Sequence, residues 1–401
     1  MTAREPRPLT VALSALPRLA PRTRTFVDTQ SWVFWAAVAL TVFGLMQWAP
    51  LVSAAIVMSP RTSLLAASLW LLYGFVFLVI LYRLELFERR SPITVLGALA
   101  WGALAAPGLG VIAAPAMHDL VASAIGSDSP WVPSFAAPLV EEPLKLMGVL
   151  ALALIPGARV RSAADGLFYG AVVGLGFQVS EGFLYTAAFA ADDGEPDTVV
   201  AMFLLRGVIG GLWSHATFAA IAGAGLGYFF NATATPLRRT AVLAGAVALA
   251  IVVHGFFDTP LFGTSPVVSS IVKGLPVLIL FLVVLRWAHL RERRTFAGLA
   301  AHIVPDDLVS PGDFTTLATR RARRRARRWA LRRGGIATAR ALKRLQGAQL
   351  SLLTAAHEDG WGSPRATELA EDVRALTQAL DARQTEADTA VPHPSSEKPP
   401  P

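Results

Sequence analysis

Side chains that could do chemistry lie in four apolar stretches of the sequence: Glu141, Glu142, Lys145, Glu181, His215, His254 and Asp258. Carboxylates and imidazoles accept or donate protons near neutral pH, and both bind metal ions. The sequence contains no cysteine, which excludes disulfides, thiolate ligands and a cysteine nucleophile. Any chemistry in these stretches therefore depends on acids and histidines.

The spacing within the stretches pairs some of these residues on one helix face. Glu141 and Lys145 are four positions apart, and so are His254 and Asp258. Residues at this spacing are neighbours on a helix surface, so Lys145 can form an ion pair and Asp258 can orient an imidazole. Pro143 weakens the backbone hydrogen bonding beside Glu141, which helps that carboxylate reach a cavity.

Ionised groups are costly in stretches of this kind. A charge at the centre of a bilayer costs about 2.5–3.5 kcal/mol on insertion scales, so it is kept where it faces a cavity or a partner. Counted at about 1.5 Å per helical residue, the acids and histidines fall at broadly similar heights, in the middle to outer half of the membrane. We therefore expect four helices to contribute to one polar chamber.

Peptide hydrolysis is one reaction that such a chamber could carry out. It needs an activated water and stabilisation of the oxyanion. We expect Glu141 to act as the general base on water, and Glu142 to orient it or share its proton. Lys145 would neutralise part of the negative charge.

The histidines would polarise the scissile carbonyl or hold a metal, while Glu181 and Asp258 orient them. A zinc-type site could be built from His215, His254 and Glu181, although the sequence has no His-Glu-x-x-His string. The cofactor therefore stays open between none and a divalent metal such as zinc. Each of these residues could also belong to a structural ion network, and Arg206 is expected to be a structural counter-ion.

The elements that position these residues are membrane helices. The chain has 401 residues, of which 54% are hydrophobic and 16% charged, whereas soluble domains have about 25% charged residues. Spans need roughly 20 apolar residues. The sequence predicts an all-α bundle of about eight transmembrane helices, at 31–50, 63–82, 93–115, 132–155, 163–190, 199–230, 240–262 and 266–288.

The distribution of arginine predicts the orientation of the bundle, because cytoplasmic loops are enriched in Lys and Arg. One set of segments contains Arg4, Arg7, Arg18, Arg22, Arg24, Arg83, Arg89, Arg90, Arg159, Arg161, Arg238, Arg239, Arg286, Arg291, Arg293 and Arg294. The opposite loops have Arg61 as their only basic residue and contain several acids, such as Asp119 and Asp128. This pattern favours a multi-pass protein of the cell membrane with both termini in the cytoplasm.

Three regions follow from this division: a basic cytoplasmic N-terminal segment (1–30), a transmembrane domain (31–288) that contains the polar chamber and would be the peptidase domain if the chamber hydrolyses peptides, and a cytoplasmic Arg-rich tail (289–401). In the tail we expect helices at 320–333, 336–356 and 364–386, broken at Gly334–Gly335, and a disordered proline-containing end. The arginine-dense run predicts contact with anionic lipid. Nucleic acid is a weaker alternative, since no recognition module accompanies the run. A partner-binding or solubilising role is also open.

The seven residues resemble the pattern of the PrsW family of bacterial intramembrane proteases, which is related to CAAX-type prenyl endopeptidases and to bacteriocin-immunity membrane proteins. That pattern has a Glu-Glu pair followed by Lys, then a Glu, a His, and a His with an acid four later, on consecutive spans. The resemblance covers about residues 95–288. One departure is Gly182, where the pattern leads us to expect Asn.

The resemblance implies cleavage of membrane-embedded or membrane-proximal protein substrates, such as an anti-sigma factor. Two other functions remain open from the residues alone. In-membrane acids and histidines also build proton relays, so a proton-coupled transporter is one rival. A non-catalytic membrane scaffold that keeps the residues as structure is the other. The polar motifs do not recur in two halves of the sequence, which disfavours the transporter. The sequence does not predict an oligomeric state.

Overall fold

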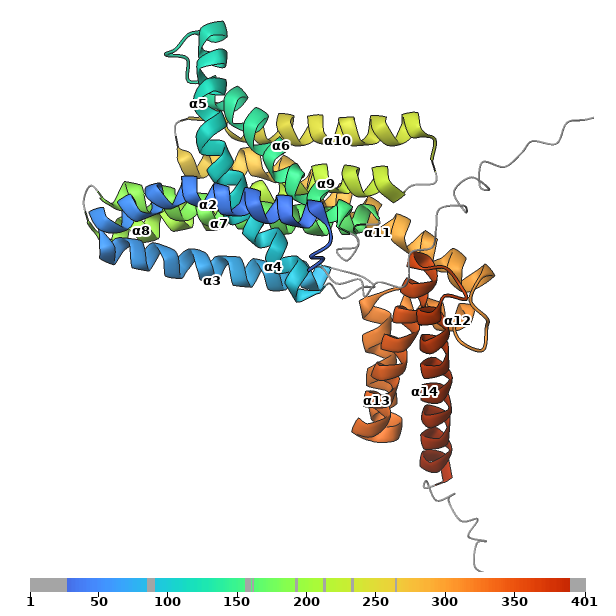
Figure 1. Ribbon diagram of the computed structural model, residues 1–401. Coiled ribbons are helices and arrows are strands. Elements are labelled where there is room, and N and C mark those ends of the chain that lie inside the picture. Colours follow the sequence, from blue (N-terminus) through green and yellow to red (C-terminus); the bar gives the residue numbers. More distant parts are fainter. Residues whose placement is uncertain are drawn as a thin grey trace, which may run out of the picture.

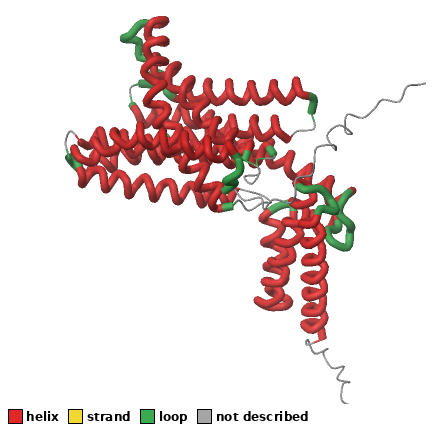
Figure 2. The backbone as a smooth tube through the Cα atoms, viewed as in Figure 1, coloured by secondary structure: helices red, strands yellow, loops and turns green. Residues whose placement is uncertain are grey.

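The computed structural model describes residues 27–84, 91–155, 160, 162–191, 194–211, 214–231, 234–263 and 265–389. These residues form helices joined by loops and turns, without strands (Figures 1 and 2). The predicted segment 1–30 lies almost wholly outside the described residues, as does the proline-containing end. Several arginines on which the orientation rests, among them Arg89 and Arg159, also lie outside them.

Among the described residues, eight helical passes form the first and larger part of the molecule, in line with the predicted bundle of about eight. Their elements are α2 (Trp32–Met58), α3 (Pro60–Leu84), α4 (Pro92–Ala100), η1 (Trp101–Ala105), α5 (Ala106–Ile125), α6 (Val132–Leu154), α7 (Ala163–Ala191), α8 (Pro196–Phe203), η2 (Leu204–Ile209), α9 (His215–Asn231), α10 (Pro236–Phe257) and α11 (Pro266–His302). Here η marks a short π-helical turn. The chain is a multi-pass membrane protein with a polytopic helical bundle.

Six of the passes are long and apolar enough to cross a membrane by themselves. The other two are α6, which contains Glu141, Glu142 and Lys145, and the interrupted pass from α8 to α9. The helix α6 departs from an ordinary span because it carries charged side chains, and the pass from α8 to α9 because its helix is interrupted before His215. Several helices are longer than predicted: α2 ends at Met58 and α11 continues to His302.

The centre of the bundle is α7. In its apolar window 72% of the residues are buried, compared with 17% in α2, α3 and α11. Glycines allow α9 to approach it closely: a Cβ atom at Gly166 would overlap the backbone of Gly223, and one at Gly174 would overlap the backbone of His215. Small residues permit such close packing of membrane helices. The Gly174 contact fixes the backbone of His215 against α7.

The second part of the molecule is a helical tail made of α12 (Pro311–Leu317), α13 (Arg320–Glu358) and α14 (Pro364–Thr389). It has an apolar core of its own, which includes Leu317, Leu352 and Val373. The helix α13 is broken at Gly335, where φ is 71°, a backbone conformation that favours glycine. The predicted break at Gly334–Gly335 is therefore present in the structure.

The tail joins the bundle through the continuous helix α11 and through a hydrogen bond. Arg320 Nη2 donates to the carbonyl oxygen of Tyr82, near the end of α3, at 2.8 Å. Figure 1 shows α13 and α14 running across the direction of the transmembrane helices, beside the end of the bundle where α11 leaves it.

Candidate active site

Lys145 lies at the centre of a buried polar cluster. Its side chain is fully buried in α6, and its Nζ atom donates to Glu142 Oε1 at 2.7 Å and to Glu141 Oε2 at 3.2 Å. The same Nζ atom lies 2.9 Å from Nδ1 of His215. An ammonium group buried in this way is stable because carboxylates compensate its charge.

His215 connects α9 to α6 and α7. It is the first residue of α9, and its Nδ1 atom lies 3.6 Å from Glu141 Oε2. On the other side of the ring, Nε2 lies 3.0 Å from Glu181 Oε2 on α7. Arg206, in the π-helical turn η2, donates to the same oxygen of Glu181 at 3.1 Å. Such turns occur frequently at functional sites.

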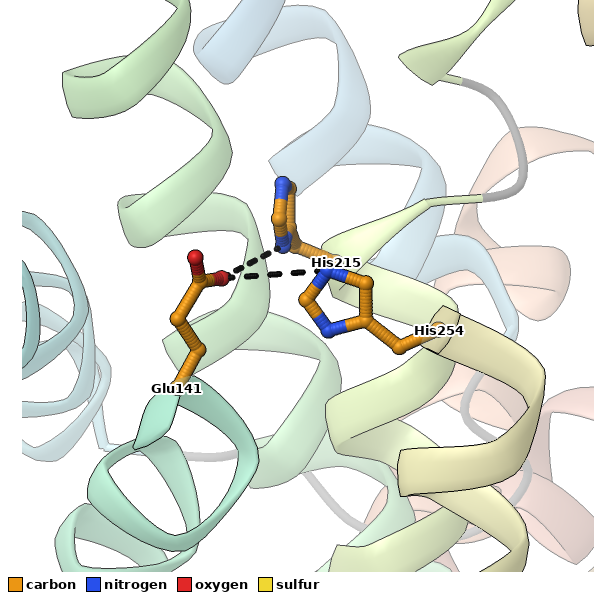
Figure 3. A group of neighbouring side chains, drawn as sticks. All are labelled: Glu141, His215 and His254. Carbon is orange, nitrogen blue, oxygen red and sulfur yellow. Dashed lines mark ion pairs between the residues drawn. The ribbon is translucent and has the colours of Figure 1, made fainter. Parts of the chain in front are cut away.

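His254 connects α10 to the same cluster. Its Nδ1 atom lies 2.8 Å from Glu142 Oε1, while Nε2 lies 3.2 Å from Asp258 Oδ2 and 3.9 Å from Glu141 Oε2. Figure 3 shows the Glu141 carboxylate on one side of the two imidazoles, with an ion-pair contact from one oxygen to each. Phe218 stacks on His254 with ring centroids 4.7 Å apart, which fixes the plane of the imidazole.

The accessible side chains of the cluster are acids and Arg206, whose side chain is 32% exposed. The Glu141 side chain is 17% exposed and that of Asp258 is 30% exposed, whereas the side chains of Glu142 and Lys145 are fully buried. A water molecule or a peptide can therefore reach Glu141 and Asp258 more easily than Glu142. The two adjacent glutamates therefore differ in their accessibility.

The structure brings all seven predicted residues together, from α6, α7, α9 and the end of α10. One predicted contact takes a different form. Glu142 does not pair with the Glu141 carboxylate; it contacts Lys145 and His254. Adjacent residues on a helix project about 100° apart, so the two carboxylates approach Lys145 from different sides. Glu181 and Asp258 contact the histidines that they were expected to orient.

Two residues near the cluster were not predicted. Ser214 Oγ donates to Gln178 Oε1, and Gln178 Nε2 donates to the carbonyl oxygen of Arg206 at 3.4 Å. These contacts connect α7 to the ends of the broken segment before His215. Gln178 lies one turn before Glu181, and this uncharged amide inside an apolar stretch was the available signal.

The carboxylates determine which ring nitrogens face Glu141. We assign the tautomers from the hydrogen-bond partners: His215 donates through Nε2 to Glu181, and His254 donates through Nδ1 to Glu142. The remaining nitrogen of His215, Nδ1, then accepts from Lys145 Nζ and lies 3.6 Å from Glu141 Oε2. The remaining nitrogen of His254, Nε2, lies 3.2 Å from Asp258 Oδ2 and 3.9 Å from Glu141 Oε2. Carboxylates that accept the other N–H of a histidine are the usual support of metal-binding imidazoles.

Glu141, His215 and His254 could hold a divalent metal, which would take the place of the Lys145 contacts with Glu141 Oε2 and His215 Nδ1. One ligand atom from each residue lies within 4.8 Å of those from the other two. Two histidines and one glutamate are a ligand set found in catalytic zinc sites. The ligand set expected from the sequence contained Glu181 in place of Glu141. Glu181 contacts the far nitrogen of His215, so Glu141 is the carboxylate that faces the inner nitrogens of both rings.

Comparisons with known proteins agree with this geometry. Residues 90–290, about half of the chain, match the family model described as PrsW family intramembrane metalloprotease. Neither the curated proteins nor the solved structures contain a match. The matched range contains every residue of the cluster and all the helices that position it. The chain is therefore a member of the PrsW family of intramembrane metalloproteases, and so a membrane-embedded peptidase.

Proposed function

We propose that the protein is an endopeptidase that hydrolyses membrane-embedded or membrane-proximal proteins, with Glu141 as the group that accepts the proton of the attacking water. The observation that carries this proposal is the position of the Glu141 carboxylate. It faces two imidazoles from different helices, and it is accessible where its neighbour Glu142 is fully buried.

The contacts of Glu141 with Lys145, His215 and His254 all use Oε2. The second oxygen, Oε1, is therefore the one that takes the proton. Proton transfer by a positioned side chain of this kind contributes about 10²–10⁴-fold to a rate. Lys145 holds Oε2 in place and compensates the charge of both glutamates.

Glu141 Oε2 and the inner nitrogens of His215 and His254 would hold the metal. Such an ion, when bound, lowers the pKa of a coordinated water and polarises a carbonyl oxygen. Glu181 and Glu142 act on the outer nitrogens and keep both rings in the orientation that points toward Glu141. Arg206 in turn holds Glu181 in place.

Three further features belong to this proposal. The peptidase unit comprises residues 31–288 and the tail residues 289–401. The bundle lies in the cell membrane with both termini in the cytoplasm, on the basis of the arginine distribution. The substrate is a membrane protein, for which an anti-sigma factor is one example, since cleavage inside a bilayer requires a substrate that enters it.

The test compares membrane-protein fragments in cells that produce the wild-type protein or the Glu141→Gln variant. We expect fragments generated by the wild type to be absent with Glu141→Gln, at equal protein levels in the membrane. Asp119→Asn is the matched control, because the Asp119 side chain is 87% exposed and lies outside the cluster. If the same fragments appear with Glu141→Gln, Glu141 is not the group that accepts the proton of the attacking water.

A second arm tests the metal in the purified enzyme. A strong chelator should abolish cleavage, and added zinc should restore it. Activity that is indifferent to chelators, in protein without stoichiometric metal, would contradict the metal assignment while leaving the role of Glu141 intact.

A further inference from the structure

The first half of α13 has an arginine stripe on its outer face. Arg323, Arg327 and Ala330 face the interior of the tail: Arg323 donates to the carbonyl oxygen of Leu317, and Arg327 Nε donates to Gln346 Oε1 at 2.6 Å. On the opposite face lie exposed residues at spacings of three and four, which share one side of a helix. We define this arginine stripe as Arg321, Arg325, Arg328 and Arg332.

Large apolar side chains flank the arginine stripe. Trp329 is 54% exposed and Leu331 is 46% exposed, one on each side of it. Arg333 lies over the Trp329 ring, 4.7 Å from its centroid, at the edge of the same surface. A basic helix face combined with tryptophan and leucine is typical of helices that lie in the plane of a membrane interface.

Like charges are crowded in this part of the tail. Burial, and then the neighbouring Arg320 and Arg327, lower the pKa of Arg323 to about 10. Crowded positive charge of this kind favours an anionic surface nearby, beyond the one acid, Glu292, that acts on Arg323.

The position of α13 identifies that partner. Arg320, immediately before the arginine stripe, is hydrogen-bonded to the carbonyl oxygen of Tyr82 near the end of α3. In Figure 1 the tail helices extend past the edge of the bundle at this end, with α13 on the side nearer the transmembrane helices. Because α3 is a candidate membrane span, its end at Leu84 lies at the level expected for the lipid headgroups.

We propose that the arginine stripe of α13, with Trp329 and Leu331, binds the anionic lipid surface next to the transmembrane bundle. The headgroup phosphates contact the arginines, and the two apolar side chains enter the interface. This contact holds the tail against the membrane that contains the peptidase site. The lipid-binding proposal does not depend on the peptidase mechanism, so each of the two proposals can be tested without the other.

The test uses the full chain in lipid nanodiscs. Because the sequence contains no cysteine, a single introduced cysteine can be labelled specifically. Leu331→Cys places a polarity-sensitive fluorophore beside the arginine stripe, and Ala375→Cys places it on an exposed position of α14 as a control. In discs with about 30% phosphatidylglycerol, we expect a blue shift and quenching by spin-labelled lipid at position 331 only. Both signals should weaken in pure phosphatidylcholine and at about 1 M salt, where the Debye length falls to about 3 Å.

A matched pair of triple variants makes the test specific. Arg321→Gln, Arg325→Gln and Arg328→Gln together should abolish the quenching at position 331. Arg340→Gln, Lys343→Gln and Arg344→Gln remove the same charge from exposed positions in the second half of α13 and should leave it unchanged. The proposal is overturned if the label stays in water in anionic discs, if neutral discs quench it equally, or if both triples act alike. A response to added RNA but not to anionic lipid would also overturn it, in favour of a nucleic acid.

Discussion

The polar cluster of the bundle and the helical tail use charge in opposite ways. In the cluster, Lys145 and Glu142 are fully buried and 2.7 Å apart. In the tail, Arg374 and Asp307 are 51% and 60% exposed and 3.3 Å apart. The distances are similar, but water screens the second pair and not the first. The geometry of an ion pair therefore says little about its importance until its burial is known.

The largest effect is expected from Lys145→Met. This change removes the cation between Glu141 and Glu142 and leaves both carboxylates without their nearest positive charge. Breaking a buried ion pair costs about 3–5 kcal/mol, so thermal unfolding in detergent should occur at a clearly lower temperature. Adding Glu142→Gln should recover part of the loss, because the orphaned charge is then removed as well. If Lys145→Met unfolds at the wild-type temperature, the cluster is more hydrated than its burial indicates.

An intermediate effect is expected from Glu181→Gln. Glu181 accepts from Nε2 of His215, and Arg206 holds it in place. Loss of such support typically weakens metal binding or activity by about 10–100-fold. Titration of the purified protein with zinc after chelation measures this change directly. Asp119→Asn serves again as the control, and equal zinc affinity in the two variants would mean that His215 does not need Glu181 for its orientation.

The smallest effect is expected from Arg374→Gln in the tail. An exposed ion pair contributes about 0–1 kcal/mol, so Arg374→Gln should change the free energy of unfolding by no more than about 1 kcal/mol. Cleavage of substrate should be unaffected. The same thermal measurement in detergent makes the result directly comparable with Lys145→Met. A loss as large as that of Lys145→Met would erase the contrast between the two regions.

The sequence by itself determined the membrane architecture, the family and the break in the tail. Long apolar stretches need helices in a bilayer because backbone groups have no other partners there. Length and hydropathy mark six of the eight passes in the described residues as candidate spans. The cost of charge in lipid singles out residues such as Glu141 and His254 from their positions in apolar stretches alone. The tail breaks at Gly335 because only glycine readily adopts its positive φ.

Tertiary structure alone decided which atoms meet. Glu142 contacts His254, 112 positions away in the chain, and Ser214 contacts Gln178, 36 positions away. Neither contact has a signal in local periodicity. The first depends on how closely α10 approaches α6, where a Cβ atom at Gly255 would overlap the backbone of Ser134, and the second on how the segment before α9 lies against α7. The same packing turns Nδ1 of His215 toward Glu141, and so makes Glu141, and not Glu181, the carboxylate that contacts both imidazoles.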